Sequence, residues 1–221
     1  SPVDRGVLAS QLSVLEKAGP KAVLIDLLFD QPTELRKDRH LREILKNYTV
    51  PLVVASAGRD EGLSADQLGF LDKFLDGVTP ARANLFTDTV DNRVRWLPGL
   101  TDFELPGMAA SIAGIAGANV PDERFRILYK RPVPGNDTIF RRFPIHMVPF
   151  LPKQWLAGKI IIVGADLPHG DRHSTPVDEI GGDNITRMAG ALIHAHGIAQ
   201  LLEGRFFIEF GVWADFLLFA L

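Results

Sequence analysis

The sequence contains no cysteine. Disulfide bonds, thiolate catalysis and cysteine-rich zinc sites are therefore excluded. The absence leaves the compartment open, because a cysteine-free chain suits a bacterial cytoplasm and a periplasm equally well. The opening residues, SPVDRGVLAS, lack the pattern of a secretory signal peptide. A chain of 221 residues buries roughly 70% of its unfolded surface, so it needs no covalent staple to fold.

A strong excess of charge of either sign is also missing. The chain has 24 Lys and Arg residues against 27 Asp and Glu residues, for a net charge of -3. This balance gives no electrostatic reason to expect nucleic acid as a partner. The most basic segment, ELRKDRHLREILK, alternates bases with acids and is typical of a solvated helix face. We therefore predict no nucleic-acid binding.

Common nucleotide-binding and catalytic motifs are absent as well. The pair Gly158-Lys159 has no upstream glycine at the spacing of a phosphate loop, and a strand rather than a helix follows it. The patterns G-x-G-x-x-G at a strand end, G-x-S-x-G and H-E-x-x-H do not occur. These absences remove the usual signals of dinucleotide-binding folds, α/β-hydrolases and zinc proteases.

What the chain does contain is an alternation of amphipathic and wholly apolar segments. A helical pattern over residues 7–18 ends at Gly19 and Pro20, and AVLIDLLF follows as a strand that is apolar on both faces. A second helix, which Asp38 could cap, precedes a second buried strand, PLVVASAG. This order predicts an α/β fold with a mainly parallel central sheet flanked by helices.

The middle of the chain predicts an additional antiparallel hairpin and edge strands. ARANLFTDTVDNRVRWLPGL indicates two strands with a turn at Asp91-Asn92. LPGMAASIAGIAGA predicts a helix with Pro106 in its first turn. RFRILYKRPV and TIFRRFPIHMVPFL predict edge strands, and KIIIVG returns to a buried parallel strand. A last helix is expected over 185–202, and no repeat or linker divides the chain.

The segment GADLPHGDRHSTPVDEIGG, residues 164–182, concentrates polar chemistry directly behind the strand KIIIVG. In an open α/β sheet, ligands bind in the crevice beyond the carboxyl ends of the strands. Polar side chains from this segment and from the end of the first strand should therefore converge at one edge. These candidates are Asp26, Asp30, Asp166, Asp171 and Thr175.

Asp26 interrupts the apolar run VLIDLLF. A buried carboxylate is costly unless another group pairs with it, and either the opening loop or His194 could supply that group. A structural pair and a functional pair look alike at this stage, so both interpretations stay open. His194 and His196 lie two residues apart on a helix, so at most one of them points toward the sheet edge. For an isolated histidine on an apolar helix, a hydrogen-bonded structural role is the favoured interpretation.

His169, Asp171 and His173 are candidate metal ligands. On an extended segment their alternating spacing could aim three side chains at one ion, which would suit a metal-dependent hydrolase. Prolines on both sides indicate an irregular path instead, and loops that mix Asp, His and Gly are common. The hydrolase is therefore kept as the alternative function, and a dimerisation spacer that binds no ligand is a third interpretation.

The segment 206–221, FFIEFGVWADFLLFAL, is mostly aliphatic or aromatic. It is shorter than the roughly 20 apolar residues of a membrane span. Glu209 and Asp215 would be costly at the middle of a bilayer but not near its surface. The segment is therefore either the start of a transmembrane helix or a C-terminal amphipathic helix packed on the domain.

The order of these segments resembles the second class of CHASE domains. These are extracytoplasmic sensory modules of bacterial cyclases, histidine kinases and related transmembrane signalling proteins. The resemblance covers about residues 4 to 205, and this sequence departs from the family at Arg187 to Gly190, where a Met-Pro-Gly approach to the last helix is usual. The matching positions are Asp26, Phe29 and Asp30; Gly158, Lys159 and Gly164; Asp171, Thr175 and Pro176; and His194 with Ala195.

The resemblance implies one sensor domain over 1–205 that makes and breaks no bonds itself, followed over 206–221 by entry into a transmembrane helix. It implies a periplasmic or extracellular location in a bacterial inner-membrane protein with a cytoplasmic cyclase or kinase effector. The expected partners are a small-molecule or ionic signal and the membrane, a homodimer is compatible with this arrangement, and no cofactor is specified. The ligand-binding residues expected are Asp26, Asp30, Asp171, Thr175, Pro176 and His194.

Overall fold

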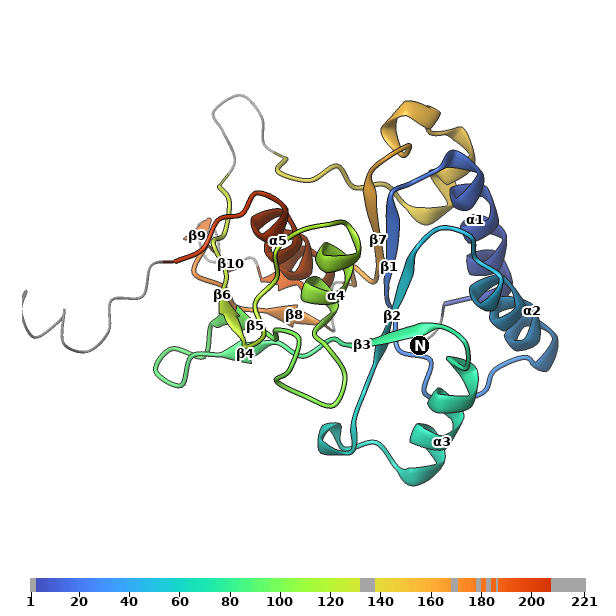
Figure 1. Cartoon of the computed structure of the whole chain (residues 1–221), viewed down its shortest axis with the longest axis horizontal. Helices are drawn as coiled ribbons and strands as arrows, with labels where there is room; N and C mark the ends of the chain where they lie inside the picture. Colours follow the sequence, from blue (N-terminus) through green and yellow to red (C-terminus); the bar gives the residue numbers. More distant parts are fainter. Residues whose placement is uncertain are drawn as a thin grey trace, which may run out of the picture.

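A parallel sheet of four strands lies between two layers of helices in the computed structural model of the chain (Figure 1). The strand order is β3-β2-β1-β7, and every neighbouring pair is parallel. The predicted α/β class with a mainly parallel central sheet is therefore confirmed. The strands are β1 (Ala22–Asp26), β2 (Leu52–Ser56), β3 (Thr79–Arg82) and β7 (Ile160–Gly164). The residues that the structure describes are 3–131, 138–167, 171–177, 180–181, 184–185 and 187–207.

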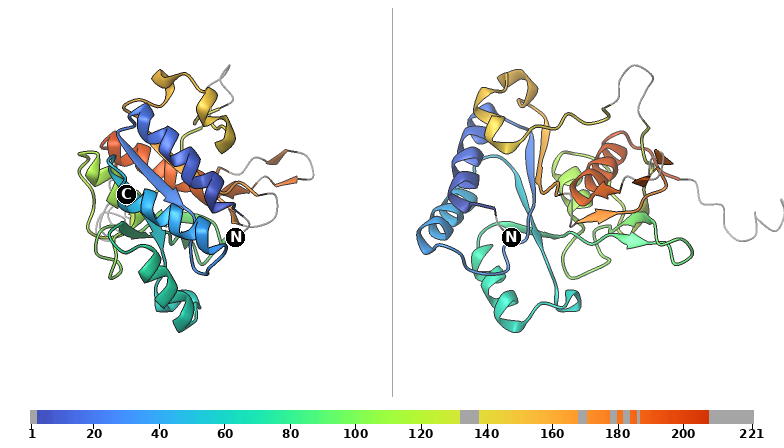
Figure 2. Two further views of the ribbon diagram at one scale, coloured as in Figure 1. Left: turned by 90° about the vertical axis from the view of Figure 1, so that its right-hand side faces the viewer. Right: turned by 180° about the vertical axis from the view of Figure 1, so that it is seen from behind.

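Helices cover both faces of this sheet. Three of them pack on one face and two on the other, as the view from behind also shows (Figure 2). The first group is α1 (Arg5–Ala18), α2 (Leu35–Lys46) and α3 (Ala65–Phe74), joined by the 3-10 helix η2 (Ile145–Phe150). The second group is α4 (Met108–Ile115) and α5 (Gly190–Leu202).

The wholly apolar sequence of β1 supports two separate cores. Successive side chains of a strand point to opposite faces of its sheet. Val23 and Ile25 accordingly pack among α1, α2 and α3, while Ala22 and Leu24 pack among α4 and α5. Strand β2 alternates in the same way. This is why both strands read as continuous hydrophobic runs rather than as an alternating pattern.

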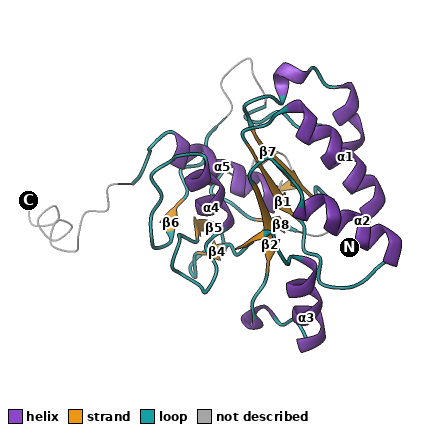
Figure 3. Ribbon diagram, turned by 45° about the vertical axis from the view of Figure 1, so that its right-hand side comes forward, coloured by secondary structure: helices purple, strands orange, loops and turns teal. Residues whose placement is uncertain are grey.

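Short antiparallel strands form a separate layer on the side of α4 and α5 (Figure 3). The three-stranded sheet contains the predicted hairpin, and Asn92 adopts a positive φ of 55° at its turn. Two further strand pairs follow β7 in the chain. The strands of the sheet are β4 (Phe86–Thr87), β5 (Val94–Leu97) and β6 (Phe125–Arg126). The two pairs are β8 (Arg172–His173) with β11 (Met188–Ala189), and β9 (Ile180–Gly181) with β10 (Asn184–Ile185).

Three local predictions were wrong. The last helix begins at Gly190 rather than at 185, because Met188-Ala189 pairs with β8 as a strand. Residues 145–150 form a 3-10 helix that packs near α1 instead of an edge strand. Pro106 precedes α4, whose N-cap is Gly107, so it does not lie in the first turn.

Two elements of the parallel core were not predicted. Strand β3 contains Pro80, which cannot donate to a ladder and is tolerated because β3 lies at the sheet edge. Helix α3 begins with a capping box between Ser64 and Gln67, a sequence signal that could have located it. Strand β7 forms the opposite edge, so its residues are only partly buried, in contrast to the buried strand expected.

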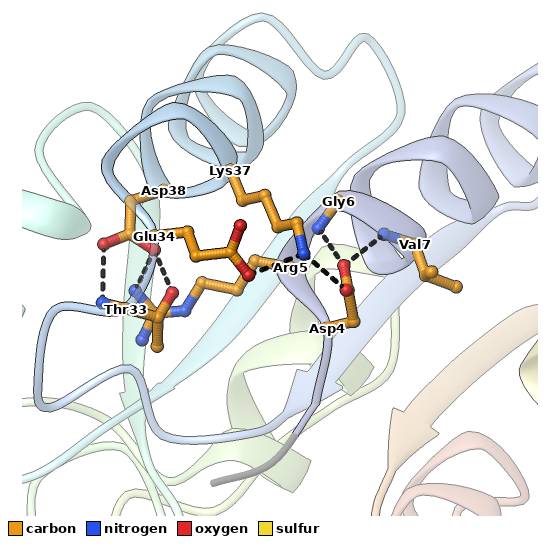
Figure 4. Close-up of polar contacts among 8 residues, drawn as sticks. All are labelled: Asp4, Arg5, Gly6, Val7, Thr33, Glu34, Lys37 and Asp38. Atoms are coloured by element: carbon orange, nitrogen blue, oxygen red, sulfur yellow. Dashed lines mark hydrogen bonds and ion pairs between the residues drawn. The ribbon is translucent and has the colours of Figure 1, made fainter.

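A buried ion pair joins the start of α1 to α2 (Figure 4). Arg5 Nη1 lies 2.8 Å from Asp38 Oδ1, and the two side chains are only 6% and 9% exposed. The backbone N–H and the hydroxyl of Thr33 also donate to the Asp38 carboxylate. Burial raises the pKa of Asp38, but the hydrogen bonds from Thr33 and Arg5 outweigh it and hold the pKa below its usual value. Asp38 is therefore not the cap of α2, whose N-cap is Glu34.

The Arg5 guanidinium is also enclosed by aromatic rings. It lies 5.3, 5.8 and 4.8 Å from the ring centroids of Phe29, Phe70 and Phe74. Its Nη2 donates to the backbone carbonyl of Gln31 at 2.8 Å. One side chain thus ties α1, the loop after β1, α2 and α3 together.

Close helix packing predicts opposite effects of the same substitution at two glycines. A Cβ at Gly197 in α5 would lie 2.2 Å from Cδ1 of the fully buried Leu97, while a Cβ at Gly69 in α3 would meet nothing within 4 Å. We expect Gly197→Ala to lower the free energy of unfolding by about 1–2 kcal/mol through overpacking. Gly69→Ala should raise it by about 0.5–1 kcal/mol, because alanine favours helix. Urea unfolding of both variants measures this, and a stabilised Gly197→Ala would contradict it.

Candidate functional site

The carboxyl ends of β1 and β7 meet at one edge of the parallel sheet. Asp26 is the last residue of β1 and lies opposite Gly164, the last residue of β7. Asp26 is largely buried, and the loop that carries Asp171 follows Gly164. This is the edge at which an open α/β sheet binds ligands.

The first turn of α5 packs against this edge. A Cβ at Gly164 would lie 2.6 Å from the Cβ of Ala191 and 3.7 Å from Oδ2 of Asp26. A Cβ at Gly190 would lie 2.6 Å from Oδ2 of Asp171. Glycine at both positions therefore permits the close approach. As a result, the carboxyl groups of Asp26 and Asp171 both lie beside the first turn of α5.

His194 lies one turn further along α5, on the same helix face as Gly190 and Ala191. It is 1% exposed, and its Nδ1 is a buried atom for which the described residues provide no hydrogen-bond partner. The backbone of Ala83 hydrogen bonds to the ring, and this bond involves Nε2 because Nδ1 has no partner. With Nε2 as the donor, Nδ1 carries a lone pair that can accept a hydrogen bond.

Asp26, Asp171, His173 and His194 form one electrostatic cluster, called here the sheet-edge cluster. Burial raises the pKa of Asp26, the charge of His194 opposes this and the charge of Asp171 adds to it. Burial lowers the pKa of His194, and the nearby carboxylate of Asp26 only partly offsets that. A hydrogen bond from His173 lowers the pKa of Asp171. The cluster therefore combines an ionised carboxylate, a carboxyl group that resists ionisation and a neutral imidazole.

The other predicted ligand-binding residues lie apart from one another. Asp30 accepts a hydrogen bond from Nε2 of Gln67 in α3 at 2.8 Å, so it belongs to the α3 side of the sheet. Thr175 is fully buried, and its carbonyl accepts from Nη1 of Arg93 at 2.8 Å. Pro176 follows it and is partly buried. The structure thus brings Asp26, Asp171 and His194 together and separates Asp30 from them.

His196 has a different environment from His194. Its Nδ1 accepts a hydrogen bond from the backbone N–H of Lys130 at 3.1 Å, and its ring packs against Tyr129 and Phe140. It is 2% exposed, and burial together with the charge of Lys130 lowers its pKa to about 4. His196 is therefore the structural histidine that the sequence favoured, and only His194 belongs to the sheet-edge cluster.

The comparison with protein families identifies the kind of domain that carries this cluster. The family model described as "CHASE2 domain" matches residues 1–221, which is the whole chain. The chain belongs to the CHASE2 family. CHASE2 domains are sensory extracellular domains of signalling proteins rather than catalytic ones. No curated protein matches this CHASE2 domain, and no solved structure does.

The metal-site hypothesis for this CHASE2 domain is only partly accessible. His169 lies outside the described residues, while His173 Nε2 and Asp171 Oδ1 are 2.7 Å apart and pair with each other. Within the ranges that the structure describes, no three His, Asp or Glu side chains are grouped so that they could hold a metal ion. The metal site over His169, Asp171 and His173 stays a hypothesis.

Arg82 at the end of β3 is a polar residue of the same edge that sequence reasoning missed. It is 5% exposed, and its Nη2 donates to both carboxylate oxygens of Asp60 at 2.8 and 2.7 Å. Its guanidinium lies 4.4 Å from the ring centroid of Phe103. A cation inside the half-apolar strand TPAR was the available signal, because buried arginine needs a partner. Arg82 ties the loop after β2 to β3.

A surface hollow of about 250 Å³ lies at the opposite end of the sheet from the sheet-edge cluster. It is formed at the amino ends of β2 and β3, where open α/β sheets do not usually bind ligands. Its position therefore does not coincide with the predicted site. The lining residues include Tyr48, Thr49, Pro51, Leu52, Gly77 and Thr79.

The boundary of the CHASE2 domain at residue 205 stays a prediction. The family match continues to residue 221, while residues 208–221 lie outside the described ranges. In the part of the chain that the structure describes, no helix is both long and apolar enough to cross a bilayer. The choice between a transmembrane start and an amphipathic helix for 206–221 is carried forward as part of the proposal below.

Proposed function

We propose that this CHASE2 domain is the extracytoplasmic ligand-binding part of a bacterial inner-membrane receptor. It controls a cyclase or kinase effector on the other side of the membrane and catalyses no reaction itself. The family match over the whole chain is the observation that carries this proposal. The sheet-edge cluster supports a ligand site, because strand-end polar groups with shifted pKa values are typical of functional sites in α/β proteins.

Helix α5 offers a direct route from the cluster toward the C-terminal segment. Its first turn packs on Gly164 beside Asp26, while Glu203 beyond its last turn pairs with Lys130 and Arg205. A helix of 13 residues spans about 20 Å. A ligand that binds two states of the domain with different affinity shifts their populations, and coupling of about 1–3 kcal/mol is typical of such control. A change in packing at the first turn of α5 would reach residues 206–221, which we propose enter the membrane.

A topology reporter tests the location. Alkaline phosphatase folds only in an oxidising compartment, because it needs disulfide bonds. In bacteria that express the natural gene truncated after Arg205 and fused to this enzyme, we expect strong phosphatase activity. Green fluorescent protein at the same position is the matched control and should be dark when exported through the general secretion pathway. An inactive phosphatase together with a fluorescent control would place the domain in the cytoplasm and overturn the proposal.

A further inference from the structure

Three hydrogen-bond acceptors converge at the sheet-edge cluster. The carboxyl group of Asp26 lies beside Gly164, and the carboxyl group of Asp171 lies against Gly190. Nδ1 of His194, one turn along the same helix face, is buried without a partner among the described residues. A buried acceptor that lacks a hydrogen bond costs about 1–3 kcal/mol, so its retention indicates a donor that is supplied from outside the chain.

We infer that Asp26, Asp171 and His194 form a binding site for a small primary-amine cation. This inference rests on the proposed function, since it names the chemical class of the ligand that the sensor domain would detect. It goes beyond that function because neither the fold nor the family match specifies a ligand class.

A primary ammonium group has three N–H donors and no acceptor. The cluster has the complementary composition, with two carboxyl groups and one imidazole lone pair. Burial and the neighbouring Asp171 both make the negative charge of Asp26 unfavourable in the empty domain. A bound cation removes that penalty, since an opposite charge nearby favours the ionised carboxylate. The ligand and the site therefore stabilise each other's charge.

Other ligand classes fit the cluster less well. An anion would meet two carboxyl groups at short range, and Asp171 already occupies the first turn of α5, where the helix dipole would otherwise attract it. A metal ion requires three or four grouped ligands, and the ranges described here contain no such group of three. A neutral hydrogen-bond donor could reach His194 but would leave the two carboxyl groups uncompensated.

Calorimetric titration of the purified domain tests the site. The probe is methylammonium chloride, and the control is tetramethylammonium chloride at the same ionic strength, which carries the same charge but no N–H donor. We expect saturable binding of methylammonium and none of tetramethylammonium. Binding of both cations alike, or of neither, would overturn the amine site. Saturable binding of magnesium in place of methylammonium would also overturn it and would favour the metal hypothesis.

Matched carboxylate variants locate the site. Asp26→Asn and Asp171→Asn each remove one charged acceptor and should weaken methylammonium binding by about tenfold or more. Asp30→Asn is the control, because Asp30 also follows β1 but bonds to Gln67, so its affinity should equal that of wild type. Asp171 is exposed, so its variant remains informative if Asp26→Asn does not fold. Equal affinity of the Asp171→Asn and Asp30→Asn proteins would disprove the assignment.

The two proposals fail in different ways. A domain that binds no amine but gives an active alkaline-phosphatase fusion remains an extracytoplasmic sensor domain with a different ligand class. An inactive fusion overturns the receptor proposal even where methylammonium binds. The titration and the reporter therefore separate the ligand from the location.

Discussion

Replacement of Arg5 by leucine is expected to lower the free energy of unfolding by about 3–5 kcal/mol. The substitution leaves the Asp38 carboxylate buried without its cation, and hydrogen bonds from Thr33 alone then hold the charge. It also removes the cation enclosed by the rings of Phe29 and Phe74. An unpaired buried charge accounts for most of the loss, because water would solvate it far better than the protein interior does.

Urea unfolding followed by tryptophan fluorescence measures this effect. The double variant Arg5→Leu with Asp38→Leu should be more stable than Arg5→Leu alone, since it no longer buries an uncompensated charge. Lys37→Leu is the control for an exposed pair, because Lys37 contacts Asp4 and Glu34 on the surface, and it should cost less than about 1 kcal/mol. If Arg5→Leu costs no more than Lys37→Leu, the ion pair does not hold α1 against α2.

Acidification from pH 7 to pH 4 is expected to remove about 3 kcal/mol of stability through His196 alone. Burial lowers the pKa of His196 to about 4 in the folded domain, from an ordinary value of 6.5. The unfolded chain therefore binds the proton first as the pH falls. The contribution of His196 is fully present above pH 6.5 and is lost as the pH falls from 6.5 toward 4. A pKa gap of this size corresponds to about 3 kcal/mol.

The variant His196→Asn isolates this effect. The asparagine Oδ1 can replace Nδ1 as acceptor for the backbone N–H of Lys130, but it does not titrate. We expect the variant to be less stable at pH 7, because it loses the ring contacts with Tyr129 and Phe140, and to lose less stability on acidification. Free energies of unfolding from pH 7 to pH 4 measure both. The exposed His40→Asn on α2 is the control and should reproduce the wild-type curve. Parallel curves for His196→Asn and wild type would rule the assignment out.

Local sequence patterns were sufficient where a structural feature depends on neighbouring residues. The continuous apolar runs of β1 and β2 predicted a covered parallel sheet, and Asp91-Asn92 predicted the hairpin turn. The same reasoning placed Asp26 and Asp171 at one sheet edge, because the carboxyl ends of parallel strands lie together. Spacing on a helix separated His194 from His196. Periodicity and chain direction determine all of these.

Sequence patterns were insufficient where a residue's partner is distant in the chain. Asp38 looked like a helix cap because Asp commonly caps helices, but its main partner is Arg5, 33 residues away. Asp30 looked like a companion of Asp26, yet it bonds to Gln67 of a helix that was not predicted. KIIIVG looked like a buried strand, but the sheet order places β7 at the edge. No local pattern carries the identity of such partners.

The sequence by itself determined the fold class, the CHASE2 membership and the sheet edge at which Asp26 and Asp171 lie. The tertiary structure alone decided that α5 begins at Gly190, that its first turn lies against both carboxyl groups, and that Nδ1 of His194 is buried without a partner in the described residues. The physical reason is that hydrophobic periodicity is a property of adjacent residues. Burial, pairing and pKa depend on which distant side chains the packing brings together.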